Sequence, residues 1–359
     1  MLQLYMINYE EALNIITNKL SVASKTKKMA LLDSVKHICA EDIYATSSLP
    51  THAIALKDGY AFLEGNSYEV STGDILKVGT DFVIPYEENL ENPPYMYNIK
   101  EKAEDIKENE LLLKKGELIT AYSITSLASQ GIKMLKVFQK PKVGILSIGD
   151  NLCPVQKEIK KGEVYNSNAL SLGARILEIG AKVSKVWQVK NNKTAIKEHL
   201  NELKKCSDFI ITTGAMSKYD AMSQLIYDDD FNIIFHKVQI APASPTAFTV
   251  FNNTPLLHLT GLPLSSLLGF ELLGVPAIKI IKNQTAHERK FLKVRNKEEF
   301  TCRDNCTSAI PGFFDGVYFK SAPSFGAGML NVLAKCNGYA LITNKNIIKK
   351  DSLVEFFTF

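Results

Sequence analysis

The sequence is poor in the two residues that most often build metal centres, because its 359 residues include only six cysteines and six histidines. Only Cys302 and Cys306 are close together, and their spacing is not the two-residue separation of zinc knuckles or redox pairs. No His-Glu helical pair suggests a metalloprotease site. We therefore expect reduced thiols in a cytosolic protein.

A concentrated excess of positive charge is also missing. The formal net charge is +4, and the lysines are spread along the chain rather than gathered in a basic stripe. This pattern does not favour a nucleic-acid partner. A small molecule that carries phosphate remains compatible with it.

The chain lacks a segment that we would interpret as a leader or a membrane span. The start, Met1 to Met6, has neither a basic cluster nor a sustained apolar run. The stretch from Pro255 to Ile281 is nearly all apolar, but it contains Pro263, Glu271 and Pro276, which a spanning helix tolerates poorly. We predict a buried strand, a turn and a buried helix there, and a cytoplasmic protein without a membrane partner.

What is present fits an ordinary globular protein of two or three domains, with 46% hydrophobic and 22% charged residues. The first 140 residues are irregular. Helical periodicity runs from Asn8 to Leu20, and a second helix is predicted over Ala121–Gln130, stopped by Gly131. The polar stretch from Leu90 to Glu110 indicates an exposed connection or a small inserted subdomain.

From Lys142 onward, unbroken apolar strands alternate with amphipathic helices. This alternation predicts a mostly parallel, doubly wound sheet covered on both faces. The expected strands are Lys142–Ile148, Lys182–Val189, Asp208–Thr212 and Pro255–Leu259, and the expected helices are Ser167–Ile179 and a helix capped by Thr194 that runs to Cys206.

Three of these strands end in small residues that favour ligand binding. They end in Ser147-Ile148-Gly149-Asp150, Thr213-Gly214 and Thr260-Gly261-Leu262-Pro263. Ligands of open α/β sheets bind outside the carboxyl ends of the strands, where turns with small and hydroxyl-bearing residues let backbone amides approach an anion.

Beyond Asn283 the pattern becomes β-like. Candidate strands are Phe291–Arg295, Gly316–Lys320, Tyr339–Thr343 and Leu353–Phe359, with a short helix near Met329–Lys335. The fold class is therefore a multidomain α/β protein. Its predicted parts are an elongated α+β N-terminal region (1–140) with a small β subdomain (about 62–105), an α/β domain (141–283) and a C-terminal β domain (284–359).

A series of motifs along almost the whole chain resembles one family, the molybdopterin molybdenumtransferases (the MoeA and gephyrin E-domain family). The run from Ala55 to Ala61 is similar to its Ser-Ala-Met-Asp-Gly-Tyr-Ala signature. The further matches, in the family's order, are Glu104-Asp105-Ile106, Lys114 to Ile132, Ser147 to Leu152, Gly162 to Asn168, Ser207 to Gly214 and Gly328 to Gly338.

The resemblance implies an L-shaped dimer and a Mg²⁺-dependent reaction in which adenylylated molybdopterin and molybdate give molybdenum cofactor and AMP. It implies a cleft between the sheet domain of one subunit and the N-terminal region of its partner. The protein is thus expected to form a homodimer and to contact other cofactor-assembly proteins.

The same resemblance assigns roles to individual residues. Asp58, Asp105 and Asp220 would be catalytic, and Asp220 would also hold Mg²⁺, which prefers oxygen ligands. The residues implied in binding molybdopterin or molybdate are Gly59, Tyr60, Ser147, Gly149, Asp150, Asn168, Thr213, Gly214, Ser217, Pro242, Pro245, Gly261, Leu262 and Pro263.

The departures from the family pattern fall at the chemistry. Asn151 replaces a glutamate, and Ala241 and Ser244 replace two lysines of a Lys-Pro-Gly-Lys-Pro loop; the loops 214–220 and 261–266 are shortened. The loss of two cationic hydrogen-bond donors would weaken oxyanion binding by about 3–6 kcal/mol unless other cations replace them. Lys57, Lys218 and Lys237 are the candidates for such a replacement.

Two main hypotheses follow, beside a third that the protein is an unrelated enzyme with a phosphate ligand on the same architecture. One is an active transferase with a rearranged oxyanion pocket. The other is a non-catalytic molybdopterin-binding or assembly paralogue that pairs with an active homologue.

Overall fold

The computed structural model describes residues 6–21, 25–286 and 290–359. The prediction that no leader is present rests on residues 1–6, of which 1–5 lie outside the described residues. The chain divides into two compact units. Unit 1 comprises residues 1–25 and 138–359, and unit 2 comprises residues 26–137.

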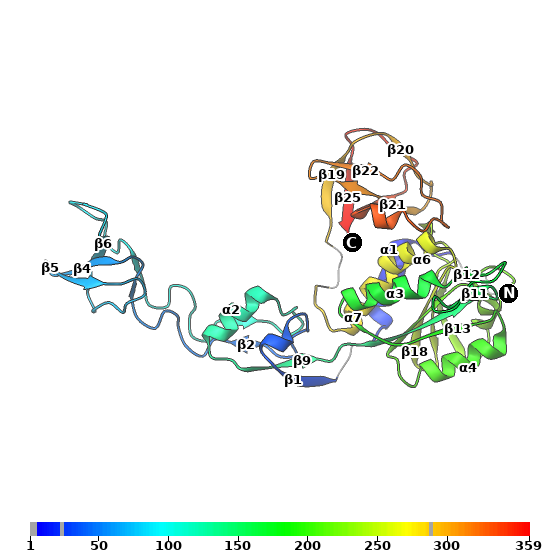
Figure 1. Cartoon of the computed structure of the whole chain (residues 1–359), viewed down its shortest axis with the longest axis horizontal. Coiled ribbons are helices and arrows are strands. Elements are labelled where there is room, and N and C mark those ends of the chain that lie inside the picture. Colours follow the sequence, from blue (N-terminus) through cyan, green and yellow to red (C-terminus); the bar gives the residue numbers. More distant parts are fainter. Residues whose placement is uncertain (1–5, 22–24, 287–289) are drawn as a thin grey trace. The chain divides into compact units, whose positions relative to one another are not determined.

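Unit 1 is built on a six-stranded sheet, which confirms the predicted α/β architecture (Figure 1). The first four strands in sheet order pair in parallel, and each of the next two pairs antiparallel with the strand before it. In that order the strands are β13 (Lys182–Val189), β10 (Lys142–Ile148), β14 (Phe209–Thr213), β18 (Thr254–Leu259), β17 (Ala247–Phe251) and β15 (Phe231–His236).

The four parallel strands are the ones that the apolar runs predicted. The antiparallel pair β15 and β17 was not predicted. Asn252 and Asn253 form the tight turn between β17 and β18, and both have a positive φ. Asparagine is one of the residues that such hairpin turns favour. An Asn-Asn pair between two apolar runs was therefore an available signal.

Helices cover both faces of the sheet because alternate residues of each strand point to opposite sides. Phe209 and Ile211 pack in one core with the helices α1 (Tyr9–Lys19) and α3 (Ser167–Glu178). Ile210 packs on the other side with α4 (Lys193–Leu203) and α5 (Ala221–Leu225). The predicted cap of α4 was wrong, because the side chain of Asn192, not Thr194, accepts the backbone N–H of Ala195.

The apolar stretch that follows β18 is a continuous helix. It consists of α6 (Pro263–Gly269), the π-helical turn η2 (Phe270–Gly274) and α7 (Val275–Ile281). Pro263–Ile281 is long and apolar enough to cross a membrane, but 89% of it is buried inside the protein. Its one carboxylate, Glu271, accepts the Nε–H of Arg175 on α3 at 2.6 Å. The prediction of a buried strand, turn and helix is confirmed.

The C-terminal part of unit 1 is a sheet that closes on itself through the pairing of β21 with β23. The predicted helix over Met329–Lys335 was wrong, since only the 3₁₀ turn η3 (Leu333–Lys335) forms there. The strands of this sheet are β16 (Ile240–Ala241), β21 (Thr307–Phe314), β22 (Tyr318–Ser321), β19 (Leu292–Asn296), β25 (Leu353–Thr358) and β23 (Gly338–Thr343), and the pair β20 (Phe300–Thr301) and β24 (Ile347–Ile348) lies outside it.

Unit 2 contains two small cores. One gathers α2 (Ala121–Ser129), β8 (Leu111–Leu113) and β9 (Met134–Phe138) around Leu127 and Leu135. The other lies under the sheet β5–β4–β6. The remaining elements are β1 (Thr26–Ala30), η1 (Leu32–Ser34), β2 (Ile43–Tyr44), β3 (Ile54–Ala55), β4 (Gly59–Leu63), β5 (Asn66–Val70), β6 (Phe82–Pro85) and β7 (Ile99–Lys100).

The division into two units differs from the predicted boundaries in two respects, because unit 1 includes helix α1 and also combines the predicted α/β and C-terminal domains. Helix α1 belongs to unit 1, because Ala12 and Ile16 are fully buried in the core that α7 also shares. The three-domain division remains a prediction. All six cysteines are free, as expected.

Candidate functional site

A cavity of about 330 Å³ lies at the carboxyl ends of β10, β14 and β18, where the sequence predicted a binding site. It is open enough to receive a small molecule. Seven of the predicted binding residues line it: Ser147, Asn168, Thr213, Gly214, Gly261, Leu262 and Pro263.

Asn168 ties two of the strand-end turns together. Its Nδ2 donates to Oγ1 of Thr213 at 3.1 Å and to the carbonyl oxygen of Gly261 at 2.9 Å. Thr213 is buried and donates its hydroxyl to the carbonyl oxygen of Thr260 at 2.9 Å. One side chain from the start of α3 therefore fixes the ends of β14 and β18 relative to each other.

Gly214 occupies a position that no other residue fits. Its φ is +96°, and a Cβ at this position would lie 2.3 Å from the carbonyl oxygen of Ile148 on the neighbouring strand. The absence of a side chain lets the β14 turn pass directly under the end of β10 and leaves its backbone facing the cavity.

Two helices begin at the cavity. Helix α3 starts at Ser167 and α6 starts at Pro263, and both segments belong to the lining. Helix N-termini carry partial positive charge and unsatisfied N–H groups, which attract anions. Within the described part of the chain, the lining itself has no Lys, Arg, Asp or Glu.

Several lining residues were not predicted as site residues. Asn166 caps α3 and accepts the hydroxyl of Ser147 at 3.0 Å, so it supports the end of β10. Tyr165 lines the cavity beside it, and Gly328 and Leu330 enter from the C-terminal part of the chain. The resembling segments 162–168 and 328–338 were the available signal for these residues.

A second group of oxygen ligands lies after β10, β13 and β14, outside the lining of the cavity. Asn191 connects two predicted aspartates, since its N–H donates to Oδ1 of Asp150 at 3.0 Å and its Nδ2 donates to Oδ1 of Asp220 at 3.0 Å. Asp220 also accepts the N–H of Ser217 at 2.9 Å. Gly149 donates its N–H to the carbonyl oxygen of Val189 at the end of β13.

This pair of carboxylates fits the chemistry of Mg²⁺ in part. Magnesium is usually held by one or two carboxylates together with water and substrate phosphates, not by a cage of protein ligands. Among the described residues no group of three or more His, Cys, Asp or Glu could hold a metal. Two carboxylates on one bridging asparagine therefore suit a metal that arrives with a phosphorylated substrate.

The loop with the altered lysine positions lies beside the cavity rather than in its lining. The carbonyl oxygen of Pro242 accepts the hydroxyl of Ser265 at 2.6 Å, which attaches this loop to the start of α6. Ala241, Ser244 and Pro245 are half-buried, and Asn151 is exposed.

The three proposed substitute cations are all exposed lysines. Lys218 is exposed and lies 5.4 Å from the ring centre of Tyr219, and Lys237 is exposed on the turn after β15. Among the described residues, neither of these two lysines lines the cavity. Lys57 lies in unit 2.

The remaining predicted residues lie in unit 2. Asp58 accepts the N–H of Thr72 at 2.6 Å, and this hydrogen bond lowers the pKa of its exposed carboxyl group. Gly59 is required at the start of β4, where a Cβ would lie 2.0 Å from the carbonyl oxygen of Ile84. Asp105 forms an exposed ion pair with Lys100, with Nζ and Oδ2 3.1 Å apart.

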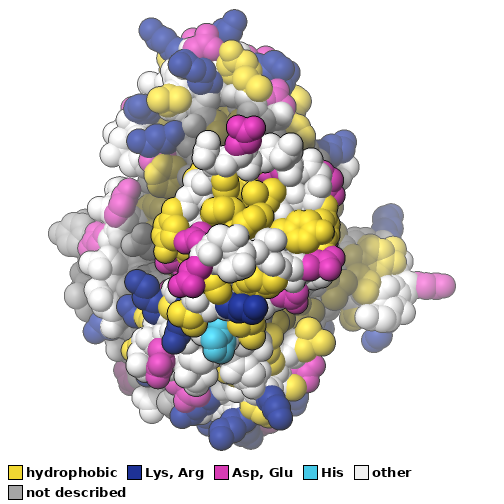
Figure 2. Space-filling model, turned by 90° about the vertical axis from the view of Figure 1, so that its left-hand side faces the viewer, with side chains coloured by type: hydrophobic (Ala, Val, Ile, Leu, Met, Phe, Trp, Pro, Cys, Tyr) yellow, Lys and Arg dark blue, Asp and Glu magenta, His cyan; other side chains and the backbone are white. Residues whose placement is uncertain are grey.

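The subdomain that carries Asp58 exposes several large apolar side chains. Tyr60 packs edge-on against Tyr86 with ring centres 5.3 Å apart. Figure 2, which looks onto the end where β4, β5 and β6 lie in Figure 1, shows hydrophobic side chains gathered together with acidic groups at their border. The exposed large apolar residues of this subdomain are Leu56, Tyr60, Ile75, Val78, Tyr86, Leu90 and Tyr95.

Comparison with known proteins shows which class of protein has a sheet domain of this kind. A family model described as the probable molybdopterin binding domain matches residues 144–280, which hold the sheet and its cavity. The chain is thus a protein with a molybdopterin-binding type of α/β domain. A second model, the MoeA N-terminal region (domain I and II), matches residues 7–131. The chain belongs to the MoeA family of molybdenum-cofactor biosynthesis proteins.

Relatives that match most of the chain have names that agree with this family. The chain is 26% identical over 317 residues to the molybdopterin molybdenumtransferase of Haemophilus influenzae, with 78% of each chain covered. It is 26% identical over 338 residues to the enzyme of that name from Staphylococcus aureus strain COL, covering 82% of this chain and 80% of the relative. The fold matches a molybdopterin biosynthesis MoeA protein of Pyrococcus horikoshii with a TM-score of 0.85 at 21% identity, over 99% of this chain and 100% of the other.

Proposed function

We propose that this protein is a molybdopterin molybdenumtransferase, which inserts molybdate into adenylylated molybdopterin and releases AMP. The observation that carries the proposal is the cavity at the strand ends. It lies in the matched molybdopterin-binding domain and combines two helix N-termini with a Thr213–Asn168 network of hydroxyl and amide groups.

In this proposal the cavity binds the phosphorylated pterin. The N-terminal turns of α3 and α6 attract the phosphate, and the Gly214 turn lets it approach the backbone closely. The uncharged lining suits a substrate whose negative charge is neutralised largely by backbone dipoles. Tyr165 and Leu330 supply apolar surface for the ring system.

Asp220 and Asp150 would hold Mg²⁺ at the rim. The ion would supply neutralisation of phosphate charge during cleavage of the phosphoanhydride. Asn191 orients both carboxylates, so we infer that it is a positioning residue. Asp58 and Asp105 would act from the N-terminal unit of a partner subunit.

This last role requires a homodimer, which we also propose. The exposed apolar face of unit 2 supports it, because contiguous apolar surface of this kind commonly marks an interaction site. Light scattering of the purified protein measures the state directly. We further propose a cytoplasmic location.

One observation favours the second candidate function, a non-catalytic molybdopterin-binding paralogue. Among the described residues, no cationic side chain lines the cavity. A cationic side chain would help to capture the molybdate oxyanion. Calorimetry with molybdopterin distinguishes the two candidates. Measurable affinity without molybdate-dependent turnover supports the paralogue.

The enzyme activity is tested by mixing purified protein with adenylylated molybdopterin, molybdate and Mg²⁺. We expect AMP release above that of a heat-killed control, and we expect Asp220→Ala to reduce it to that control. Asp220→Asn keeps the shape of the side chain but removes its charge, so it should also lose activity while remaining folded. Asp229→Ala, at an exposed position on the loop before β15, is the matched control. Wild-type protein that releases no AMP would reject the proposal.

A further inference from the structure

A cavity of about 680 Å³, which we call the C-terminal cavity, lies in the last part of unit 1. The paired strands β21 and β22 and parts of the segment 322–336 line it. Its volume is well within the range of small-molecule sites, which is about 300–1,000 Å³. The candidate site described above does not account for this cavity.

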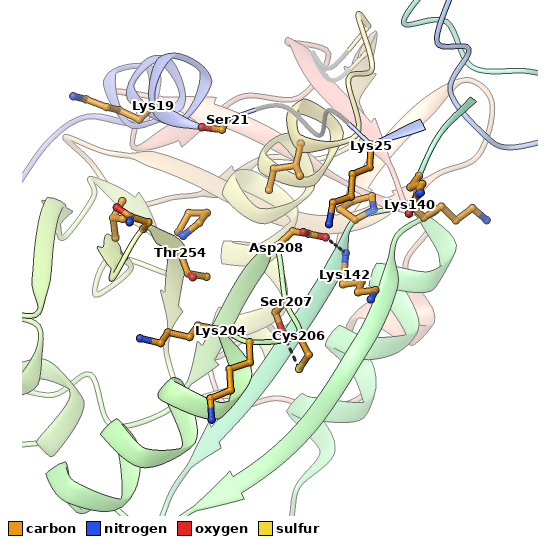
Figure 3. Close-up of a pocket in the computed structure, with 17 residues that line it drawn as sticks. Lys19, Ser21, Lys25, Lys140, Lys142, Lys204, Cys206, Ser207, Asp208 and Thr254 are labelled. Carbon is orange, nitrogen blue, oxygen red and sulfur yellow. Dashed lines mark hydrogen bonds between the residues drawn. The ribbon is translucent and has the colours of Figure 1, made fainter. Parts of the chain in front are cut away.

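Another cavity of similar volume, about 690 Å³, lies at the amino ends of β10, β14 and β18. In Figure 3, Lys19, Lys140 and Lys204 point away from one another and out of that cavity. Its cationic groups therefore do not converge on one ligand.

One short segment separates the C-terminal cavity from the candidate site. Leu330 belongs to the lining of both cavities. Its neighbour Met329 lines the C-terminal cavity, and Gly328 lines the candidate site. The two cavities are therefore adjacent, on either side of residues 328–330.

This separating segment is held in place on both sides. The backbone N–H of Ser265 donates to the carbonyl oxygen of Ala327 at 3.3 Å, which attaches the segment to the first turn of α6. Val332 packs against the main core of unit 1. Within the loop, the backbone N–H of Gly326 donates to the sulfur of Met329 at 3.2 Å. The wall between the cavities is thus formed before any ligand binds, which lowers the entropic cost of binding.

The lining of the C-terminal cavity suits a flat aromatic group. The ring of Phe313 on β21 is 52% exposed and contacts no other aromatic ring among the described residues. Met329 and Val332 add apolar surface, and Ser321 and Asn331 add hydroxyl and amide groups. Nucleobases stack on exposed aromatic side chains of this kind, and polar groups contact the edge of the base.

The charges of this lining do not favour a ligand with many phosphates. Nζ of Lys320 lies 3.0 Å from Glu298, and Nζ of Lys297 lies 3.8 Å from Asp315, so both cations already have partners. Lys335 lines the cavity without an ion-pair partner among the described residues. Recognition by stacking and apolar contact, with a single phosphate nearby, fits this arrangement better.

We propose that the C-terminal cavity binds the adenosine end of the adenylylated substrate, with Leu330 between the nucleoside and the pterin. This inference rests on the proposed function, whose substrate carries both a pterin and an adenylate. The candidate site, with about 330 Å³, is near the lower limit of small-molecule cavities and is expected to hold one of these two parts. Two adjacent cavities with different linings suit a substrate with two dissimilar ends.

The test is calorimetric titration of the full chain with AMP, ribose 5-phosphate and molybdopterin. We expect saturable binding of AMP and at least tenfold weaker binding of ribose 5-phosphate, which lacks the base. Phe313→Ala should weaken AMP binding on the order of tenfold, because the stacking contact is lost, and should leave molybdopterin binding unchanged. Phe313→Tyr keeps a ring and should retain AMP binding. Leu353→Ala is the matched control, since Leu353 is an exposed apolar residue of the same sheet outside the lining.

A variant of the candidate site separates this inference from the proposed function. Asn168→Ala should weaken molybdopterin binding and leave AMP binding unchanged. Weaker AMP binding in Asn168→Ala but not in Phe313→Ala would assign the adenylate to the candidate site, which overturns the inference while the proposed function stands. AMP binding that depends on Phe313, in a protein that releases no AMP from the substrate, would instead reject the transferase and support a purine nucleotide site.

Three further results would overturn the inference. They are equal weakening of AMP binding by Phe313→Ala and Leu353→Ala, equal affinity for AMP and ribose 5-phosphate, and no saturation at millimolar AMP. Circular dichroism spectra check that each variant is folded.

Discussion

At the scale of single residues, the candidate site depends on small side chains more than on charged ones. Gly214, Thr213 and Asn168 define the cavity through backbone approach and hydrogen bonds. Their motif was recognisable from sequence, because Gly beside Thr at a strand end is typical of anion-binding turns. What sequence could not give is that Asn168 is the residue that joins the turns after β14 and β18.

The Gly214 turn leads to a stability prediction. Gly214→Ala combines strain from a positive φ with a clash against the carbonyl oxygen of Ile148, so we expect the free energy of unfolding to fall by at least about 2 kcal/mol. Gly162→Ala is the matched control, since its φ is +88° but nothing lies within 4 Å of the added Cβ. It should cost only about 1 kcal/mol. Urea unfolding followed by circular dichroism measures both, and equal losses would argue against the clash.

At the scale of elements, a buried polar bridge joins three strands of the main sheet. His258 on β18 bonds through Nδ1 to Thr212 on β14 and through Nε2 to Thr249 on β17, each at 2.8 Å. Burial lowers the pKa of His258 to about 3. The imidazole therefore remains neutral in the folded state at ordinary pH, and the two hydroxyl groups accommodate either tautomer.

This bridge predicts a pH dependence of stability. Below pH of about 6.5 the unfolded chain protonates His258 while the folded chain does not, until pH approaches about 3. The contribution of His258 is therefore present above this window and is lost as pH falls through it, with a slope of about 1.4 kcal/mol per pH unit. In His258→Gln this part of the slope should disappear.

The measurement is urea unfolding between pH 7 and pH 4, with His52→Gln as a control for loss of an exposed histidine. An unchanged slope in His258→Gln would mean that this residue is not the titrating group.

Elements also differed in how well sequence predicted them. The central strands and α3 follow directly from long apolar runs and a 3.6-residue period. The strand β21 was missed because Pro311 and Gly312 interrupt an otherwise apolar run. Both nevertheless lie in the paired part of the strand, opposite Tyr339 and Gly338 of β23. The helix predicted near Met329 was wrong because short polar–apolar mixtures carry no reliable period.

At the scale of the whole molecule, the chain is two units with separate cores. Unit 2 begins with β1 and ends with β9, and these two strands pair with each other. The points where the chain enters and leaves unit 2 are thus adjacent, as in domains that tolerate excision.

We therefore expect residues 26–137, expressed alone, to fold and to unfold cooperatively on heating. The physical reason is that both of its cores are complete within this range. Residues 26–120 are the control, because this fragment lacks Leu127, Leu135 and Val137 of the first core and should not fold. Dispersed amide resonances and a sigmoidal thermal transition are the measurements. A non-cooperative transition for 26–137 would mean that unit 2 depends on unit 1.

The sequence by itself determined the parallel sheet, the strand-end turns and the family, because apolar periodicity and short motifs are local properties of the chain. Only the tertiary structure decided which side chains share a cavity. It brought Asn168 to Thr213, joined Asp150 and Asp220 through Asn191, and left the lining of the candidate site without a cationic side chain among the described residues. These are juxtapositions of residues far apart along the chain, and only the packing of strands and helices creates them.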